Sequence, residues 1–324
     1  MIELQGISKD YRVARRAPGF GQAVRALFSR EYETIHALRD VSFTICDGEM
    51  VGYIGPNGAG KSTTIKIMCG VLTPDRGVCT INGRVPWRDR RKHVRHIGVV
   101  FGQRSQLWWD VPVQDSFELL RDIYGVEEGA FRRNLSELTE LLDLSELLRS
   151  PTRTLSLGQR MRCEIAASLL HSPDILFLDE PTIGLDAVSK LAVRQFIRRL
   201  NRERGTTVLL TTHDMQDIEA LTERILLIGR GQLLFDGSLT DLQARSSGQK
   251  KLIVAYHGAP PVLPAGLTPL EQREGRLVAS LHPEELSVAD ALAALSAQVE
   301  VRDLSVTGAT AEELVAGLYR EYAI

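Results

Sequence analysis

The sequence predicts an α/β fold in which a mostly parallel sheet carries helices on both faces. Three observations predict it. A short apolar run at residues 50–54 leads into a glycine-rich loop, and a helical pattern follows that loop directly. Two continuous apolar or β-branched runs, at 175–178 and 207–211, are typical of strands that are buried on both faces of a parallel sheet. A helical stretch at 187–203 lies between these two runs and completes a strand–helix–strand unit.

The other elements of this core follow in order along the chain. Residues 1–13 are expected to form a strand and a turn, and residues 37–54 alternate as strands around a turn. An Asn-Gly turn predicts a hairpin over 80–84, which adds to an antiparallel β subdomain. The short β-branched run at 97–101 is typical of a buried strand. A last hairpin is expected over 224–236.

Two segments interrupt the core. Residues 12–36 are an Arg-rich insert, interpreted either as a short amphipathic helix in its second part or as a solvated loop. Residues 104–172 are expected to form an inserted helical subdomain, since apolar residues recur through this stretch near helical spacing. The last helix of this subdomain is predicted over 160–171, because Pro173 follows it.

The chain of 324 residues is long enough for two domains. A first domain is expected over 1–245, and a boundary at the polar stretch 246–249 opens a small C-terminal α+β domain over 246–324. This accessory domain is predicted to hold strands at 252–256, 277–281 and 299–306 and helices at 284–297 and 310–322. We interpret it as regulatory, since it shows no catalytic constellation.

The glycine-rich loop carries the strongest signal in the sequence. It consists of Gly55, Pro56, Asn57, Gly58, Ala59, Gly60, Lys61, Ser62 and Thr63. The spacing G-x-x-x-x-G-K-S/T between a strand and a helix predicts a P-loop NTPase core. Glycines let successive N–H groups point at phosphates, and the helix N-terminus adds a positive dipole end. Lys61 supplies a cation to the outer phosphates and Ser62 a hydroxyl to Mg²⁺, so the loop predicts nucleoside triphosphate binding.

Hydrolysis needs a metal carboxylate and a group that activates water. Asp179 ends an apolar strand, where it can hold hydrated Mg²⁺, and Glu180 follows, where it can accept a proton from the attacking water. Gln103 and His213 follow two other strands. Because the carboxyl ends of parallel strands meet at one crevice, Gln103 is expected to reach Mg²⁺ or the water, and His213 the γ-phosphate.

A second anion site is expected at the start of the helix near residue 160. Ser156, Leu157, Gly158 and Gln159 lie directly before it, and a hydroxyl, exposed amides and a helix dipole favour phosphate. The two phosphate-binding elements are expected to lie far apart in one chain. A two-fold dimer, in which each glycine loop faces the other chain's helix end, resolves this separation.

Composition limits the other partners. A formal net charge of −2 gives no support to nucleic acid as a general partner. The four cysteines have no metal-ligand spacing, and they are expected to be buried apolar residues. The longest apolar runs are far shorter than the ~20 residues that a membrane helix needs. If this protein works at a membrane, we expect another chain to span it.

On these motifs, residues 1–240 resemble the ATP-binding subunit of an ABC transporter. Tyr11 stands where that family has an aromatic residue that stacks on adenine, and residues 55–63 match its Walker A loop. Gln103 matches the Q-loop, and residues 175–180 match the Walker B strand.

The matches continue in the second half of the domain. Residues 155–159 match the signature sequence, Asp186 lies in the match to the D-loop, and His213 matches the switch histidine. The family signature normally has Gly where Leu157 stands. The resemblance implies an ATPase that binds ATP and Mg²⁺ and closes head to tail with a second copy or a homologous ATPase subunit. Closure would then drive transmembrane permease subunits, which hold the ATPase at the cytoplasmic face of the cell membrane.

Residues 101–110 and the C-terminal domain are similar to ATPases of drug-type exporters whose permeases are separate chains. The leading hypothesis is therefore export, and the alternatives are an importer ATPase or a soluble ABC ATPase outside transport. Trp108 and Trp109 are expected to include a docking residue for the permease, because Trp is enriched in binding hot spots. The competing interpretation is that both side chains pack inside the helical subdomain.

Overall fold

A computed structural model describes residues 1–14, 32–102, 104–245, 250–282, 284–308 and 310–322. The chain divides into two compact units, Met1–Asp236 and Gly237–Ile324. The division lies upstream of residue 246 because helix α9 (Leu239–Arg245) contacts α11 (Ala311–Glu321) and so belongs to the second unit. Among the helices of the described residues, none is both long and apolar enough to cross a membrane.

The larger sheet of the first unit has six strands in the order β5-β6-β7-β3-β8-β9. They are β5 (Ile97–Phe101), β6 (Ile175–Asp179), β7 (Thr207–Thr211), β3 (Met50–Ile54), β8 (Arg224–Gly229) and β9 (Gln232–Ser238). The four neighbouring pairs from β5 to β8 are parallel, which confirms the predicted α/β fold. Arg230 and Gly231, at φ 46° and 78°, form the two-residue turn from β8 to β9.

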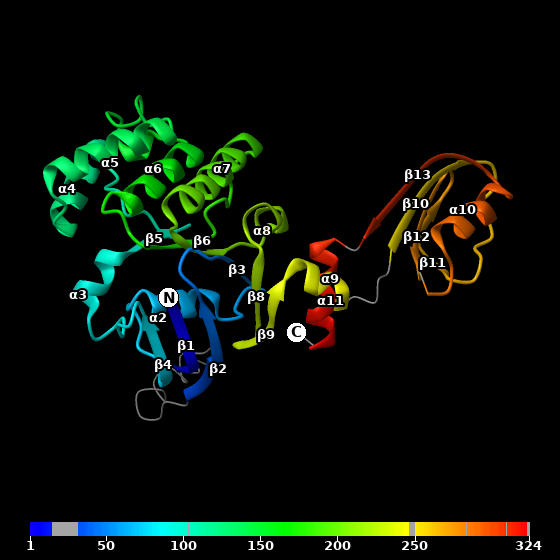
Figure 1. Cartoon of the computed structure of the whole chain (residues 1–324), viewed down its shortest axis with the longest axis horizontal. Helices are drawn as coiled ribbons and strands as arrows, with labels where there is room; N and C mark the ends of the chain where they lie inside the picture. The colour runs from blue at the N-terminus through cyan, green and yellow to red at the C-terminus, as the bar shows by residue number, and fades with distance from the viewer. Residues whose placement is uncertain (15–31, 103, 246–249, 283, 309, 323–324) are drawn as a thin grey trace, which may run out of the picture. The chain divides into compact units, whose positions relative to one another are not determined.

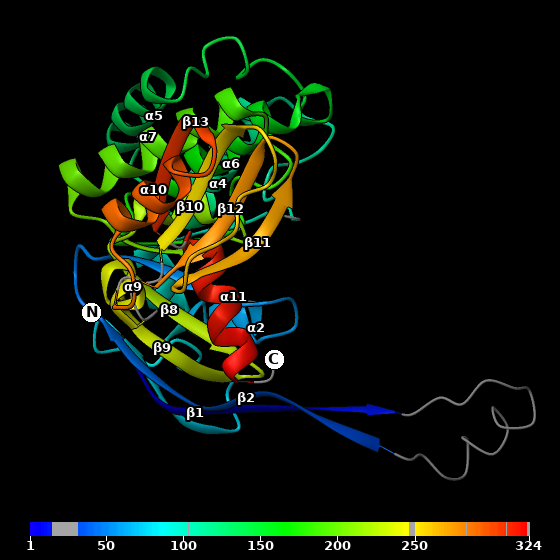
Figure 2. The same ribbon diagram turned by 90° about the vertical axis from the view of Figure 1, so that its right-hand side faces the viewer.

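An antiparallel sheet in the order β2-β1-β4 forms the second layer. Its strands are β1 (Ile2–Ala14), β2 (Tyr32–Ile45) and β4 (Arg76–Ile81). β1 and β2 run side by side as a long ribbon (Figure 2), and its last register pair is Ala14 with Tyr32. The expected insert therefore begins and ends as strand, which the β-branched and aromatic residues near these ends favour. The amphipathic helix expected in its second part lies outside the described residues.

The helices of the first unit fall into two sets. Those attached to the sheets are α2 (Lys61–Met68), α3 (Arg90–His93) with the 3₁₀ turn η1 (Val94–His96), α7 (Ala187–Arg204) and α8 (Met215–Leu221). The predicted helical subdomain contains α4 (Val113–Tyr124), α5 (Glu128–Leu141), the 3₁₀ turn η2 (Thr152–Thr154) and α6 (Leu157–Leu169). Figure 1 shows α4, α5 and α6 together, away from the antiparallel sheet. α6 also contacts β5, so the helix that begins at Ser156 joins the subdomain to the parallel sheet.

A continuous apolar core joins the two sheets of the first unit through α2. Ile2 and Leu4 of the antiparallel sheet, Ile65 of α2 and Phe177 of the parallel sheet belong to one cluster of buried residues. Burial of such side chains stabilises the fold by about 1.5–3 kcal/mol each. The core therefore fixes the glycine loop, which lies between β3 and α2, against both layers.

The second unit has its own antiparallel sheet, in the order β11-β12-β10-β13. Its elements are β10 (Lys250–His257), β11 (Leu267–Arg273), β12 (Arg276–Leu281), α10 (Val288–Ser296) and β13 (Glu300–Gly308). The sequence pattern missed β11. This edge strand is mostly exposed and contains Pro269, next to an irregularity in its register with β12. Proline and weak alternation are common in edge strands, which is why periodicity does not detect them.

Candidate nucleotide-binding and catalytic site

The glycine loop requires glycine at two points for different reasons. Gly60, which precedes α2, has φ 112°, and an added Cβ would lie 2.7 Å from the carbonyl oxygen of Ala37. Gly55 has ordinary backbone angles, but an added Cβ would lie 2.4 Å from the carbonyl oxygen of Ile228. The loop therefore combines a left-handed turn with close backbone packing, and both keep its amides at the start of α2.

Lys61 is nearly buried at the centre of this loop. Its ammonium donates hydrogen bonds to the carbonyl oxygens of Gly55 at 2.5 Å and Pro56 at 3.2 Å. Burial lowers the pKa of Lys61, and the carboxylates of Glu180 and Asp179 oppose that shift. A cation held by neutral carbonyls gains free energy when anionic phosphate oxygens come within its reach.

Asp179 ends β6 and faces the glycine loop. Thr211, at the end of the neighbouring strand β7, donates its hydroxyl to Asp179 Oδ1 at 2.6 Å. Ser62 donates its hydroxyl to Asp179 Oδ2 at 3.4 Å. The predicted metal residues Ser62 and Asp179 therefore lie together, and their hydroxyl and carboxylate oxygens fit a hard cation such as Mg²⁺. Gln103, the third predicted metal residue, lies outside the described residues.

Glu180 has an unusual backbone that directs its carboxylate. Its φ is 56°, in the left-handed region that non-glycine residues seldom adopt. Its N–H donates to the carbonyl oxygen of Thr211 at 3.0 Å. Its carboxylate Oε2 lies 3.2 Å from Nδ1 of the exposed His213. Backbone strain of this kind concentrates at functional sites, and here it brings the predicted base and the predicted switch histidine into contact.

Tyr11 lies on the β1–β2 ribbon, where its register partner is Ile35. Its ring is half-buried, and the ammonium of Lys9 lies 6.0 Å from the ring centre. Because side chains alternate along a strand, Val13 shares a face with Tyr11. Val13 and Ile35 are both exposed, so this face of the ribbon offers an aromatic ring beside apolar side chains.

The predicted signature residues form the start of α6. Ser156 Oγ accepts the N–H of Gln159 at 3.2 Å, and Gln159 Oε1 accepts the N–H of Ser156 at 2.8 Å. This reciprocal capping box fixes the first turn of the helix. Since Ser156 uses its oxygen as the acceptor, the hydroxyl proton takes no part in the cap and can be donated to an anion.

Leu157 and Gly158 pack against the predicted D-loop. An added Cβ on Gly158 would lie 2.6 Å from Ser189 Oγ, and one on Gly184 would lie 2.7 Å from Leu157 Cδ2. Asp186 caps α7 by accepting the N–H and the hydroxyl of Ser189 at 2.9 and 2.8 Å, and these bonds lower the pKa of Asp186. The leucine at position 157 therefore covers the D-loop, and the signature and D-loop form one packed surface.

Sequence reasoning missed a buried acid that joins the loop after the predicted base to the loop before the predicted switch histidine. Asp217 on α8 is fully buried and accepts the hydroxyls of Thr182 and, at 3.0 Å, Thr212. Arg194 of α7 donates its Nε to the same carboxylate at 2.6 Å. Thr182 follows Glu180-Pro181, and Thr212 precedes His213. In the sequence Asp217 has no distinguishing signal, because an acid in the first turn of a helix is common.

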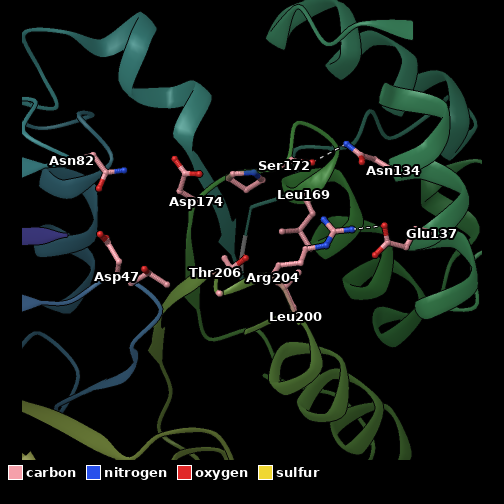
Figure 3. A pocket seen from close by; sticks show the side chains of 13 residues that line it. Asp47, Asn82, Asn134, Glu137, Leu169, Ser172, Asp174, Leu200, Arg204 and Thr206 are labelled. Carbon is pink, nitrogen blue, oxygen red and sulfur yellow. Dashed lines mark hydrogen bonds and ion pairs between the residues drawn. The ribbon is translucent and has the colours of Figure 1, made fainter. Parts of the chain in front are cut away.

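A separate cavity of about 710 Å³ lies at the opposite end of the parallel strands (Figure 3). Asp174, which precedes β6, and Thr206, which precedes β7, line it. At its rim Arg204 pairs with Glu137 of α5 at 2.6 Å. Because Asp179 and Thr211 end the same strands, this cavity is not part of the site at the glycine loop. Its polar lining joins the helical subdomain to the amino-terminal edge of the sheet.

The comparisons with known proteins agree with this geometry. A model of the ABC transporter family matches residues 38–183. The ABC transporter ATP-binding protein NatA of Bacillus subtilis is 32% identical over 215 residues, 66% of this chain and 87% of its own length. The daunorubicin resistance ATP-binding protein DrrA3 of Streptomyces coeruleorubidus is 31% identical over 289 residues, 88% of each chain.

A solved ATP-binding cassette, a dimer in a post-hydrolysis state with ADP and phosphate, is also similar. The TM-score is 0.62 at 27% sequence identity, over 74% of this chain and 99% of that one. The resemblance noted from the motifs is thereby confirmed, as are the P-loop NTPase fold and the ATPase activity. This chain belongs to the ATP-binding subunits of ABC transporters.

Proposed function

We propose that this ABC ATPase drives export through transmembrane permease subunits that are separate chains, at the cytoplasmic face of the cell membrane. The match to a protein named for daunorubicin resistance supports export, because resistance to a drug is a property expected of an exporter. This match extends over 289 residues. The first unit ends at Asp236, so that match reaches into the second unit as well. The observation that carries the catalytic part is the contact between Glu180 and His213 at 3.2 Å, beside Asp179.

The glycine loop holds the triphosphate. Backbone N–H groups at the start of α2 and the Lys61 ammonium surround the phosphates, and Lys61 exchanges its carbonyl partners for phosphate oxygens. Ser62 and Asp179, together with Gln103, would hold Mg²⁺, which neutralises charge that develops on the phosphates. Tyr11 stacks on adenine from the β1–β2 ribbon, where base stacking is worth about 1–3 kcal/mol.

Glu180 is the general base. Its carboxylate accepts the proton of the attacking water as the water oxygen bonds to the γ-phosphorus. The bond between the γ-phosphorus and the oxygen that bridges it to the β-phosphorus breaks in the same step, so ADP leaves and inorganic phosphate is formed. His213 lies against Glu180 and orients its carboxylate through Nδ1, and the exposed imidazole would donate the N–H of its other nitrogen, Nε2, to a γ-phosphate oxygen. Thr211 contacts both acids: its hydroxyl donates to the Asp179 carboxylate, and its carbonyl and hydroxyl oxygens both accept the backbone N–H of Glu180.

A second subunit completes the site. Ser156, Gly158 and Gln159 at the start of α6 would contact the γ-phosphate of the facing subunit, and Asp186 would follow with the same surface. The free hydroxyl proton of Ser156 supports this role, because phosphate oxygens only accept hydrogen bonds. Leu157 packs on the D-loop, so the cap geometry does not need glycine at position 157.

The permease docks at Trp108 and Trp109. These side chains are 41% and 53% exposed, whereas their neighbour Leu107 is 5% exposed and anchors the segment. Exposed paired indoles are unusual outside binding surfaces, which supports docking over the interpretation that both pack in the core.

The decisive variants are Glu180→Gln and Lys61→Ala. Glu180→Gln is expected to keep ATP binding and to lower kcat by about 100-fold to 10,000-fold, because an amide cannot accept the water's proton. Lys61→Ala should weaken ATP binding and abolish turnover. Parental turnover in Glu180→Gln protein would refute the assignment of the base.

Export is tested in everted vesicles that contain the chain and its permease, which should accumulate daunorubicin only with hydrolysable ATP.

A further inference from the structure

A buried carboxylate of α6 holds the segment that leads to the exposed tryptophans. Glu164 is 4% exposed, and its carboxylate accepts the hydroxyl of Ser105 and, at 3.1 Å, the N–H of Gln106. The side-chain amide of Gln106 donates in return to the carbonyl oxygen of Glu164 at 3.0 Å. Three hydrogen bonds therefore join one residue of the signature helix to two consecutive residues of this segment.

The far end of the same segment is held from the same side. Arg160 lies four residues before Glu164, so both project from one face of α6. Its guanidinium lies 5.9 Å from the ring centre of Trp109. Just before α6, Arg153 donates its N–H to the carbonyl oxygen of Trp109 at 3.0 Å. The segment from Ser105 to Trp109 is thus attached at both ends to α6 and to the turn that precedes it.

The chemistry of Glu164 makes this attachment specific. Burial raises the pKa of Glu164, and the bonds from Ser105 and Gln106 oppose that shift. A buried carboxylate without donors costs free energy, and Ser105 and Gln106 both come from the tryptophan segment. Moving the segment away from α6 would leave the carboxylate unsatisfied, so the two elements are expected to move together.

We propose that Glu164 is a positioning residue that couples the start of α6, where Ser156 would meet the facing subunit's nucleotide, to the docking residues Trp108 and Trp109. An α-helix rises 1.5 Å per residue, so Ser156 and Glu164 stand about 12 Å apart on one rigid rod. When the start of α6 moves toward the facing subunit's nucleotide, the hydrogen bonds of Glu164 to Ser105 and Gln106 move the tryptophan segment with the helix. This inference rests on the proposed docking of the permease at the tryptophans.

The first experiment measures the link without a permease. The chain has three tryptophans, so Trp87→Phe leaves Trp108 and Trp109 as its only indoles. In this background with Glu180→Gln, added MgATP should shift the indole emission. Adding Glu164→Ala should reduce that shift at least threefold while ATP affinity stays near parental. The melting temperature should fall, because Ser105 and Gln106 lose a buried acceptor. Glu203→Ala, an exposed acid that pairs with Arg199 on α7, is the matched control and should leave the shift unchanged.

Three outcomes overturn the link. They are an undiminished shift in Glu164→Ala protein, no shift in the parent, and ATP binding that weakens together with the loss of the shift, which would mark Glu164 as merely structural.

The second experiment uses the whole transporter. Glu164→Ala should lower daunorubicin accumulation in vesicles about tenfold, while the basal ATPase activity of the isolated subunit stays within twofold of the parental value. Glu164→Gln should recover part of the lost accumulation. If the emission shift depends on Glu164 but Trp108→Ala and Trp109→Ala both transport normally, the docking proposal fails and the link stands.

Discussion

Asp217→Asn tests how strongly one buried carboxylate holds the catalytic loops. The side chain of Asp217 is fully buried, and that of its partner Arg194 is 12% exposed. The asparagine keeps the size of the side chain but removes its charge, which leaves the guanidinium without its principal partner. Thr182 and Thr212 also lose a charged acceptor.

The size of the effect follows from these contacts. Removing one partner of a buried ion pair costs about 3–5 kcal/mol. The carboxylate of Asp214 remains 3.5 Å from Arg194, so we expect the lower end, about 3 kcal/mol. For a unit of this size each kcal/mol lowers the melting temperature by about 2–4 °C, so the variant should melt about 6–12 °C lower.

The assay is thermal unfolding followed by scanning fluorimetry without nucleotide, because bound ATP would add stability of its own. The matched control is Glu219→Gln, which removes the same charge from an exposed position of α8 and should change stability by less than about 0.5 kcal/mol. A melting temperature of Asp217→Asn protein equal to that of the control would refute the reasoning. The variant should also lower kcat, since Thr182 and Thr212 adjoin the loops that carry the base and the histidine.

The remaining predictions concern the nucleotide and the partners. Tyr11→Ala should raise the Kd for ATP about 5-fold to 150-fold, as a loss of about 1–3 kcal/mol implies, and Tyr11→Phe should not; equal effects in a binding titration would count against stacking. Mixing Lys61→Ala protein with Ser156→Arg protein places both lesions in one site of a heterodimer. ATPase activity should partly return, and two inactive proteins that stay inactive together would show that both sites must act or that no composite site forms. Trp108→Ala or Trp109→Ala should reduce transport while basal ATPase stays near normal; combined loss of transport, ATPase and melting temperature would place the indoles in the core.

Local signals explain what the sequence could predict. The glycine spacing of residues 55–63 and the buried runs of the parallel strands depend on neighbouring residues, so they are visible without a fold. The same holds for the anion site expected at the start of α6, since Ser156 lies directly before a helical pattern, whereas the capping box with Gln159 is seen only in the structure. These features position the candidate phosphate site, the predicted base and the start of α6.

What could not be predicted depends on contacts between distant parts of the chain. Asp217 and Glu164 are ordinary helix acids in the sequence, and only the fold buries them against hydroxyls from other segments. The left-handed backbone of Glu180 could not be predicted either, because glycine and asparagine are the residues that usually indicate this conformation and position 180 has neither. β11 escaped because an exposed edge strand with a proline lacks alternation. Non-local burial accounts for the two acids, whereas β11 was missed because its residues lack the local pattern on which strand prediction depends.

The packing of Leu157 on Gly184 and of Gly158 on Ser189 has a consequence for subunits of unlike sequence. The signature and the D-loop pack together within one chain. When the second subunit has a different sequence, both elements that it presents to the first subunit therefore differ together. In the composite site proposed above, each nucleotide of a pair of unlike subunits would face the signature surface of the opposite chain, so the two nucleotides would be inequivalent. A defect in one such surface would slow hydrolysis only of the ATP that it faces. Such a pair could keep one ATP bound for a long time, holding the subunits together, while the other ATP is hydrolysed.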